Sequence, residues 1–161
     1  MKKIILSVIT LLGLTFTSQS QEIAKNALGI RPGTNNGFGG ETTYQRGLSN
    51  HNRLEFNLGW RDIRDYDAIK GLALYQWVWN LDGNFNWYVG AGAGIASWDY
   101  DGTKDHDSGT SVFAAGDIGI EYGFKKVPLL LSLDARPEIG SGNYDDDNFG
   151  FDVGIGIKFK F

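Results

Sequence analysis

The sequence predicts an all-β fold, a single antiparallel up-and-down barrel of eight strands, and three observations carry this prediction. Apolar residues alternate with small or polar ones in eight segments, so each segment would have one apolar and one small or polar face as a strand. The chain contains 23 glycines and 14 % aromatic residues, whereas disordered chains are poor in aromatic residues. Short turn-like connections alternate with longer acidic ones, as expected for successive hairpins.

The beginning of the chain is expected to be a signal peptide rather than part of the fold. A basic start precedes a mostly apolar run at Ile4–Phe16, and small residues follow up to Ser20. This is the layout of a secretory signal, and the apolar run is too short for a typical membrane-spanning helix. We expect cleavage near Ser20, with a signal peptide over residues 1–20 and a barrel domain over residues 21–161. An uncleaved N-terminal anchor is the alternative.

The composition excludes several classes of protein. The chain has no cysteine, so it has neither a disulfide nor a lipid-modified N-terminal cysteine. The formal net charge of -4 gives no reason to expect nucleic-acid binding. No stretch after the signal segment reaches eighteen apolar residues, which excludes a transmembrane helix there and leaves a β-barrel open.

The eight expected strands are separated by turn residues. Their ranges are Ala24–Pro32, Gly37–Arg46, Arg53–Arg61, Ile69–Leu81, Trp87–Ala96, Ala114–Phe124, Leu129–Glu138 and Phe149–Phe161. Each is about as long as a tilted strand that crosses a bilayer, roughly nine to eleven residues. The last segment alternates most strictly. The fourth has apolar residues on both faces, and there we assign Tyr75, Trp77 and Trp79 to the apolar face.

The connections predict which strand ends lie together. The tight turns are expected at 49–52, 82–84 and 125–128. The more acidic links are expected at 62–67, 99–111 and 140–148, and the first connection, 33–36, is short as well. In an up-and-down barrel the two kinds of connection lie at opposite ends.

Side-chain volume discriminates among the architectures that eight amphipathic antiparallel strands allow. These are a sandwich, a soluble barrel with its apolar faces inward, and a membrane barrel with its apolar faces outward. An eight-stranded barrel has an interior just wide enough for side chains to fill. The apolar faces carry many aromatic, leucine and isoleucine residues, whereas the opposite faces are rich in glycine, alanine and serine. The sequence therefore favours a transmembrane barrel with its apolar face outward and a polar lumen.

Charged residues recur on the small-residue faces. The seven acids there are Glu41, Glu55, Asp117, Glu121, Asp134, Glu138 and Asp152. The seven bases are Lys25, Arg31, Arg61, Lys70, Arg136, Lys158 and Lys160. Buried charges must be paired or hydrated, so this balanced set predicts an ion-paired, mostly closed lumen. The alternative is the solvated face of a soluble sandwich. A separate basic rim is expected at the tight turns from Arg46, His51, Arg53, Lys125 and Lys126.

Aromatic residues are concentrated near the strand ends. Near the tight turns are Trp77, Trp79, Trp87, Tyr122, Phe124, Phe159 and Phe161. Near the longer links are Trp60, Trp98 and Tyr100. Two aromatic girdles at the two membrane interfaces produce this arrangement.

These features together resemble a known family, the small eight-stranded outer-membrane β-barrels of the OmpA/OmpX type. The segment VGAGAG at Val89–Gly94, followed by Trp98, is similar to a porin-family outer-membrane barrel domain of Gram-negative bacteria such as the Bacteroidetes. The resemblance implies location in the outer membrane, contact with its lipid and lipopolysaccharide, and insertion by the barrel-assembly machinery. In the family a terminal aromatic and the apolar residues before it form the assembly signal. The matching residues here are Ile155, Ile157, Phe159 and Phe161.

The expected function is a structural or interaction role in the outer membrane, by a monomer with no cofactor. The alternatives are a narrow channel for water, ions or very small solutes, a lipid A-modifying hydrolase or acyltransferase, and a soluble periplasmic barrel that carries an apolar ligand. Catalysis is disfavoured because the two histidines, His51 and His106, are expected outside the strands. The acidic link at 99–111 resembles a calcium loop in composition only. The expected short extracellular loops also argue against an adhesive protrusion.

Overall fold

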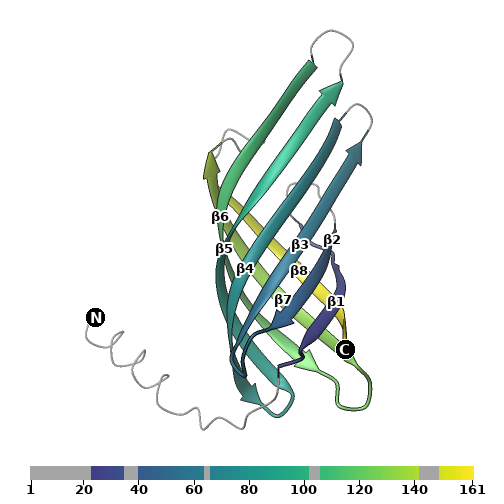
Figure 1. Cartoon of the computed structure of the whole chain (residues 1–161), viewed down its shortest axis with the longest axis vertical. Helices are drawn as coiled ribbons and strands as arrows, with labels where there is room; N and C mark the ends of the chain where they lie inside the picture. Colours follow the sequence, from purple (N-terminus) through teal and green to yellow (C-terminus); the bar gives the residue numbers. More distant parts are fainter. Residues whose placement is uncertain (1–22, 35–39, 64–65, 102–105, 142–148) are drawn as a thin grey trace, which may run out of the picture.

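The strands close into one barrel. The computed structural model describes residues 23–34, 40–63, 66–101, 106–141 and 149–161. Its strands are β1 (Asn26–Arg31), β2 (Glu41–Gly47), β3 (Asn52–Ile63), β4 (Tyr66–Asp82), β5 (Phe85–Asp101), β6 (His106–Gly123), β7 (Leu129–Ser141) and β8 (Phe149–Lys160). Each strand pairs antiparallel with the next, and β8 pairs with β1 (Figure 1). The predicted eight-stranded up-and-down barrel is confirmed.

The tight turns and the end of the chain lie at the same end of the barrel, the lower end in Figure 1. The β4–β5 turn has Gly83 at a φ of 54°, a left-handed conformation that glycine adopts without a Cβ clash. The backbones of Asn26 and Phe161 exchange two hydrogen bonds of 3.1 and 3.0 Å, which join the first strand to the end of the last. The barrel therefore closes through the terminal residue.

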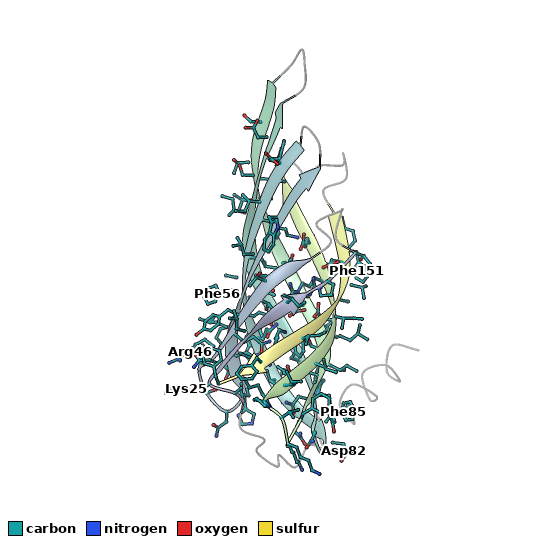
Figure 2. All side chains as sticks on the ribbon, turned by 90° about the vertical axis from the view of Figure 1, so that its right-hand side faces the viewer. Lys25, Arg46, Phe56, Asp82, Phe85 and Phe151 are labelled. Carbon is teal, nitrogen blue, oxygen red and sulfur yellow. The ribbon has the colours of Figure 1, made fainter. Side chains whose placement is uncertain are left out.

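The two faces of the wall have opposite chemistry. On β8 the even positions from Gly150 to Lys158 are buried and the odd positions are exposed, with Asp152 at 1 % and Phe151 at 59 % exposure. The same alternation places Phe56 and Phe151 on the outside of the barrel, where Figure 2 shows them projecting from different sides. Because the outside is apolar and the inside is polar, the assignment of the apolar face to the outer surface is confirmed.

The apolar band has the height of a bilayer. At its lower edge Trp79 stacks on Trp87 with ring centroids 4.6 Å apart, and at its upper edge Trp60 lies opposite Ile69. Ile69 lies ten residues before Trp79 on β4. At about 3.3 Å per residue and a tilt of about 40°, ten residues span roughly 25 Å. This matches the apolar band of about 25 Å on transmembrane barrels. Among the described residues no helix is long and apolar enough to cross a membrane.

Three strands are much longer than expected. β4 and β5 have 17 residues each and β6 has 18, so most of the link expected at 99–111 is paired strand. The link expected at 62–67 is likewise mostly the end of the β3–β4 hairpin. Figure 1 shows both hairpins rising above the rest of the barrel. The expectation of short extracellular connections without a β-rich protrusion is therefore wrong. Apolar alternation stops where neither face meets lipid, although backbone pairing continues there.

Candidate functional site

The candidate site is the charged interior, a set of twelve buried charged side chains inside the barrel. Its members are Arg31, Glu41, Arg53, Glu55, Lys70, Asp117, Glu121, Asp134, Arg136, Glu138, Asp152 and Lys158. Each is at most 7 % exposed. They point inward because each occupies the inward position of its strand's alternation. The wall thus holds ionised groups away from both lipid and bulk water.

Arg31 on β1 connects three strands that meet at the closure of the barrel. Its Nε donates to Asp134 Oδ1 on β7 at 2.8 Å, and its Nη2 pairs with the same carboxylate. Its Nη1 donates to Asp152 Oδ2 on β8 at 2.5 Å. Glu41 on β2 lies 3.6 Å from the guanidinium. One cation on β1 therefore holds carboxylates from β2, β7 and β8, on both sides of the seam between β1 and β8.

Arg136 occupies the centre of the charged interior. It donates to Glu41 at 3.1 Å and to Glu55 at 2.5 Å, and its Nε lies 3.5 Å from both Asp117 and Asp134. A planar guanidinium with five donors suits such a position because it can satisfy several carboxylates at once. The four carboxylates come from β2, β3, β6 and β7. Arg136 therefore ties strands across the lumen.

Glu55 is the acidic counterpart of Arg136. Besides the bond from Arg136, it accepts from Gln45 Nε2 at 2.5 Å and from Lys158 Nζ at 3.3 Å. Lys158 also donates to Ser132 Oγ at 3.3 Å. The carboxylate is fully buried, so these donors are what offset the loss of its hydration.

Two further ion pairs lie outside this central cluster. Toward the tight-turn end, Arg53 donates to Gln76 at 2.6 Å and to Glu121 at 2.7 Å. Its guanidinium also lies 4.8 Å from the centre of the Tyr88 ring, a cation–π contact. In the other pair Lys70 donates to both oxygens of Glu138 at 2.7 and 2.8 Å.

Two buried polar side chains lie opposite each other without a protein partner among the described residues. These are Thr43 and Asn57, which face each other across β2 and β3. The Thr43 hydroxyl and both polar atoms of the Asn57 amide have no hydrogen bond there. Both side chains are buried, and buried polar groups without protein partners ordinarily bind water. We therefore expect the interior to be hydrated at this point.

The charged interior differs from the predicted set at the ends of the strands. Lys25 is exposed before β1 begins, and Lys160 donates to the Phe124 carbonyl at 3.1 Å near the tight-turn rim, so neither lies in the charged interior. Arg53, expected at the rim, is buried inside instead. The side chain of Arg61 lies outside the described residues. The described interior thus holds seven acids and five bases, rather than equal numbers.

A simple signal could have placed Arg53 correctly. It lies two positions before Glu55 on the same strand and therefore has the same inward direction. Its nearness to the expected turn suggested a rim position, although β3 already begins at Asn52. The strand alternation does not extend to Lys25 because that residue precedes β1. The neutral partners Gln45, Gln76 and Tyr88 were not singled out because uncharged residues carry no pairing signal.

The two histidines lie in different parts of the chain. His51 is exposed in the β2–β3 turn, where its backbone N–H donates to Ser49 Oγ at 3.3 Å. His106 is the first residue of β6, opposite Asp101, and not part of a loop as expected. Its side chain lies outside the described residues. The part of the chain that the structure describes contains no group of three or more His, Cys, Asp or Glu placed to hold a metal ion.

The residues of the expected assembly signal lie on the outer face of the closing strand. Ile155, Ile157 and Phe159 are exposed on β8, and Phe161 follows it. Ile157 and Phe159 pair with Ile30 and with the next outward residue of β1. The segment therefore forms both the seam of the barrel and part of its apolar surface.

An apolar outer band of bilayer height around an ion-paired interior defines a transmembrane β-barrel. No protein family and no curated protein matches the sequence. Similar solved structures do exist. The N-terminal β-barrel domain of Pseudomonas aeruginosa OprF is 14 % identical, covers 86 % of this chain and 100 % of that chain, and has a TM-score of 0.66.

Two further solved structures have the same fold. Neisserial surface protein A is 13 % identical, with 84 % of this chain and 94 % of that chain covered and a TM-score of 0.61. Ail, the attachment invasion locus protein of Yersinia pestis, is 14 % identical, with 84 % and 96 % covered and a TM-score of 0.60. At these identities the likeness shows the shared fold, that of the eight-stranded transmembrane barrels.

Proposed function

We propose that this chain is an outer-membrane barrel of a Gram-negative bacterium with a structural or interaction role and a mostly closed lumen. The observation that carries this proposal is the pairing inside the barrel. Each of the twelve buried charges has an oppositely charged partner at 3.5 Å or less. Pores that select ions usually line their passage with one sign of charge, whereas this interior links both signs across the lumen.

The interaction role has its own support in the two long hairpins. β5 and β6 remain paired from Phe85 and Tyr122 up to Asp101 and His106, well above the Trp60 level of the apolar band. This part of the sheet rises above the rest of the barrel (Figure 1). In the proposed orientation it lies outside the membrane and offers a paired surface to the exterior. Two of the similar barrels are named for the cell surface and for attachment. A partner outside the cell would meet these hairpins first.

The route to the membrane is part of the proposal. Residues 1–20 serve as the signal peptide with cleavage near Ser20, and residues 21–161 form the mature domain. The barrel-assembly machinery reads Phe161 and the outward residues of β8, and the mature barrel is a monomer in contact with outer-membrane lipid and lipopolysaccharide. Fractionation with a surface label on Lys104 tests the location and the topology together. Labelling of intact cells supports the proposal, and labelling only after lysis contradicts it.

The carrier alternative requires an apolar interior. The interior is charged and its apolar residues face outward, so the chain is unsuited to carry an apolar ligand inside. Dissolution of the folded protein without detergent would nevertheless revive this alternative. Release or transfer of acyl chains on purified lipopolysaccharide would likewise revive the enzyme alternative.

Conductance is the first prediction. The folded protein, identified by its heat-modifiable migration in a detergent gel, is expected to give no discrete current steps in planar bilayers even at high protein load. The reason is that an ion would have to displace paired side chains that fill the lumen of an eight-stranded barrel. Reproducible single-channel steps from the heat-modifiable band, absent from a boiled sample, would establish the narrow channel instead.

A further inference from the structure

Arg46 is a cation on the lipid-facing side of the barrel wall. On β2 the inward positions are buried, whereas Tyr44 and Arg46 occupy outward positions. Tyr44 lies opposite Leu28 on β1 and Phe56 on β3, whose exposed side chains belong to the apolar band. Arg46 is one outward position nearer the tight-turn end. Its guanidinium therefore lies at the lower edge of the apolar band, where lipid headgroups begin.

The Arg46 guanidinium is held in place but not neutralised. Its Nη1 donates to Asn26 Oδ1 at 2.7 Å, and the Tyr44 hydroxyl donates to the same oxygen at 2.9 Å. The backbone of Asn26 is in turn fixed at the seam by its two hydrogen bonds with Phe161. Among the described residues the guanidinium has no carboxylate partner and no second acceptor, so its other N–H donors remain available. Because a charge at this level must be paired or hydrated, an oriented guanidinium with free donors suits a phosphate.

A second cation lies in the same part of the rim. The Gly47 backbone N–H donates to the Lys25 carbonyl at 3.0 Å, which places Lys25 beside the residue that follows Arg46. Figure 2 shows Lys25 and Arg46 projecting from the same side of the barrel near its lower end. The Lys25 side chain is exposed, and its ammonium has no partner in the part of the chain that the structure describes. Two cations without an acidic partner therefore lie in one sector of the membrane edge.

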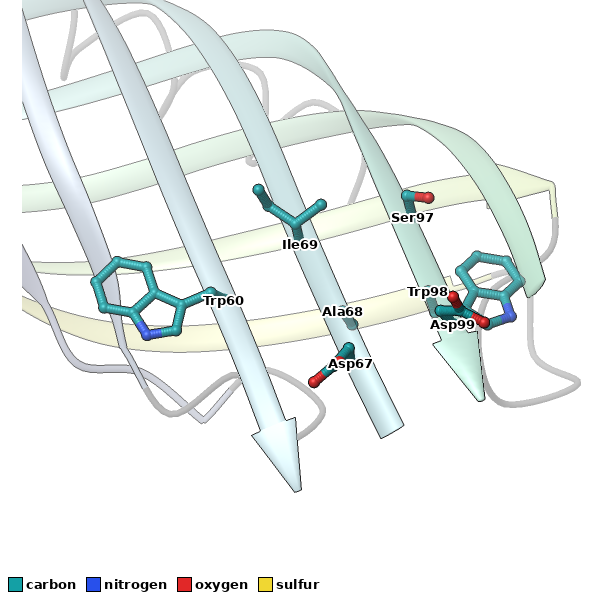
Figure 3. Close-up of a pocket in the computed structure, with 7 residues that line it drawn as sticks. All are labelled: Trp60, Asp67, Ala68, Ile69, Ser97, Trp98 and Asp99. Atoms are coloured by element: carbon teal, nitrogen blue, oxygen red, sulfur yellow. The ribbon is translucent and has the colours of Figure 1, made fainter. Parts of the chain in front are cut away.

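The two edges of the apolar band differ in charge. Wherever side chains are described, the exposed lysines and arginines all lie at the tight-turn end, and they are Lys25, Arg46, Lys125 and Lys126. The exposed acidic side chain described at that end is Asp82 at the end of β4, which lies away from Arg46 in Figure 2. At the upper edge Asp67 and Asp99 lie just beyond Ile69 (Figure 3). An anionic headgroup is therefore favoured at the lower edge.

We propose that Arg46 and Lys25 bind the phosphate of one anionic phospholipid in the leaflet that borders the tight turns. One acyl chain of this lipid lies against Leu28 and Phe56 in the apolar band. Arginine binds a phosphate through paired N–H donors, and the lysine adds a second positive charge. A zwitterionic headgroup that ends in an ammonium is disfavoured, because Lys25 repels the ammonium. Only the assignment to the periplasmic leaflet rests on the proposed function, whose orientation the Lys104 label tests separately.

Native mass spectrometry of the whole folded barrel in detergent tests the headgroup preference. The probes are phosphatidylglycerol and phosphatidylethanolamine with identical acyl chains, added at equal concentration in the presence of EDTA. We expect one phosphatidylglycerol to be retained about tenfold over phosphatidylethanolamine, the ratio that two exposed basic residues at a membrane surface can supply. Equal retention of the two lipids would overturn the proposal. Displacement of the bound lipid by an equal concentration of inorganic phosphate would also overturn it, because the acyl chain would then contribute nothing.

Paired variants separate this site from diffuse attraction by the whole basic rim. Arg46→Gln combined with Lys25→Gln is expected to reduce the preference for phosphatidylglycerol to about twofold or less, because both cations are lost. The matched control, Lys125→Gln combined with Lys126→Gln, removes the same charge from the β6–β7 turn and is expected to keep the preference. All four side chains are exposed, so both variants should fold, and heat-modifiable migration checks this. Equal losses in the two variants, or an unchanged preference without Arg46 and Lys25, would contradict the proposed site.

Discussion

Replacement of Arg136 by methionine is expected to lower the free energy of unfolding by about 3–5 kcal/mol. The guanidinium lies within 3.5 Å of four carboxylates, Glu41, Glu55, Asp117 and Asp134. Methionine fills similar space but leaves these carboxylates without their central cation. The cost is that of buried charges without a partner, which exceeds the net value of an intact pair.

Urea unfolding of the barrel in phospholipid vesicles, followed by tryptophan fluorescence, measures this cost. Arg46→Met is the control, because Arg46 is exposed and, among the described residues, its guanidinium donates to Asn26 alone, at 2.7 Å. We expect that control to lose about 0–1 kcal/mol. If Arg136→Met does not fold, adding Glu55→Gln should restore a measurable transition by removing one uncompensated charge. Equal losses at Arg136 and Arg46 would contradict the paired interior.

Replacement of Ile155 by arginine is expected to cost about 2–4 kcal/mol, the cost of a lipid-facing cation near the bilayer midplane. Ile155 is 54 % exposed on the outer face of β8, opposite Leu133 of β7. The charge would have no water and no acidic partner on that face. The same urea titration measures the loss, with Leu129→Arg at the tight-turn end as a control expected to cost about 0–1 kcal/mol.

The neighbouring position should respond to volume instead of charge. A Cβ at Gly154 would lie 2.6 Å from Arg31 Nε, so any side chain there displaces the guanidinium from its carboxylates. Gly154→Ala and Gly154→Ser are therefore expected to cost about the same, although serine is polar. If polarity determined the cost at Gly154 and size determined it at Ile155, the assignment of inside and outside would be reversed.

The alternation of a membrane strand made most of the fold predictable. Lipid outside and a crowded polar interior impose opposite demands on successive residues, so Asp152 and Val153 already differ in kind at neighbouring positions of β8. The upper parts of β5 and β6 were not predicted because this contrast between the two faces is absent there. Above the band neither face meets lipid, so the residues around Asp99 and Ser108 carry no apolar period, although their strands remain paired.

Which charged residues face the interior was more predictable than which of them pair with one another. Alternation places Arg31, Asp134 and Asp152 on inward faces, but Arg31 is 103 and 121 residues away from its two partners. Which inward residues meet depends on the closure of the sheet and on the stagger of its strands, and neither can be read from local sequence. The misplacement of Lys25 and Arg53 comes from the expected strand bounds, because Lys25 precedes β1 whereas Arg53 already lies within β3.

Site-directed spin labelling tests the central claim, a lipid-facing outer surface around a closed polar interior, most directly. The chain has no cysteine, so single cysteines at Leu133, Ile155 and Ser132 introduce unique labelling sites. We predict that labels at Leu133 and Ile155 in vesicles collide far more with oxygen than with a water-soluble nickel chelate. The thiol at Ser132, which is buried inside the barrel, should resist labelling until the protein unfolds. Ready labelling at Ser132 together with nickel-accessible labels at Leu133 and Ile155 would contradict the account.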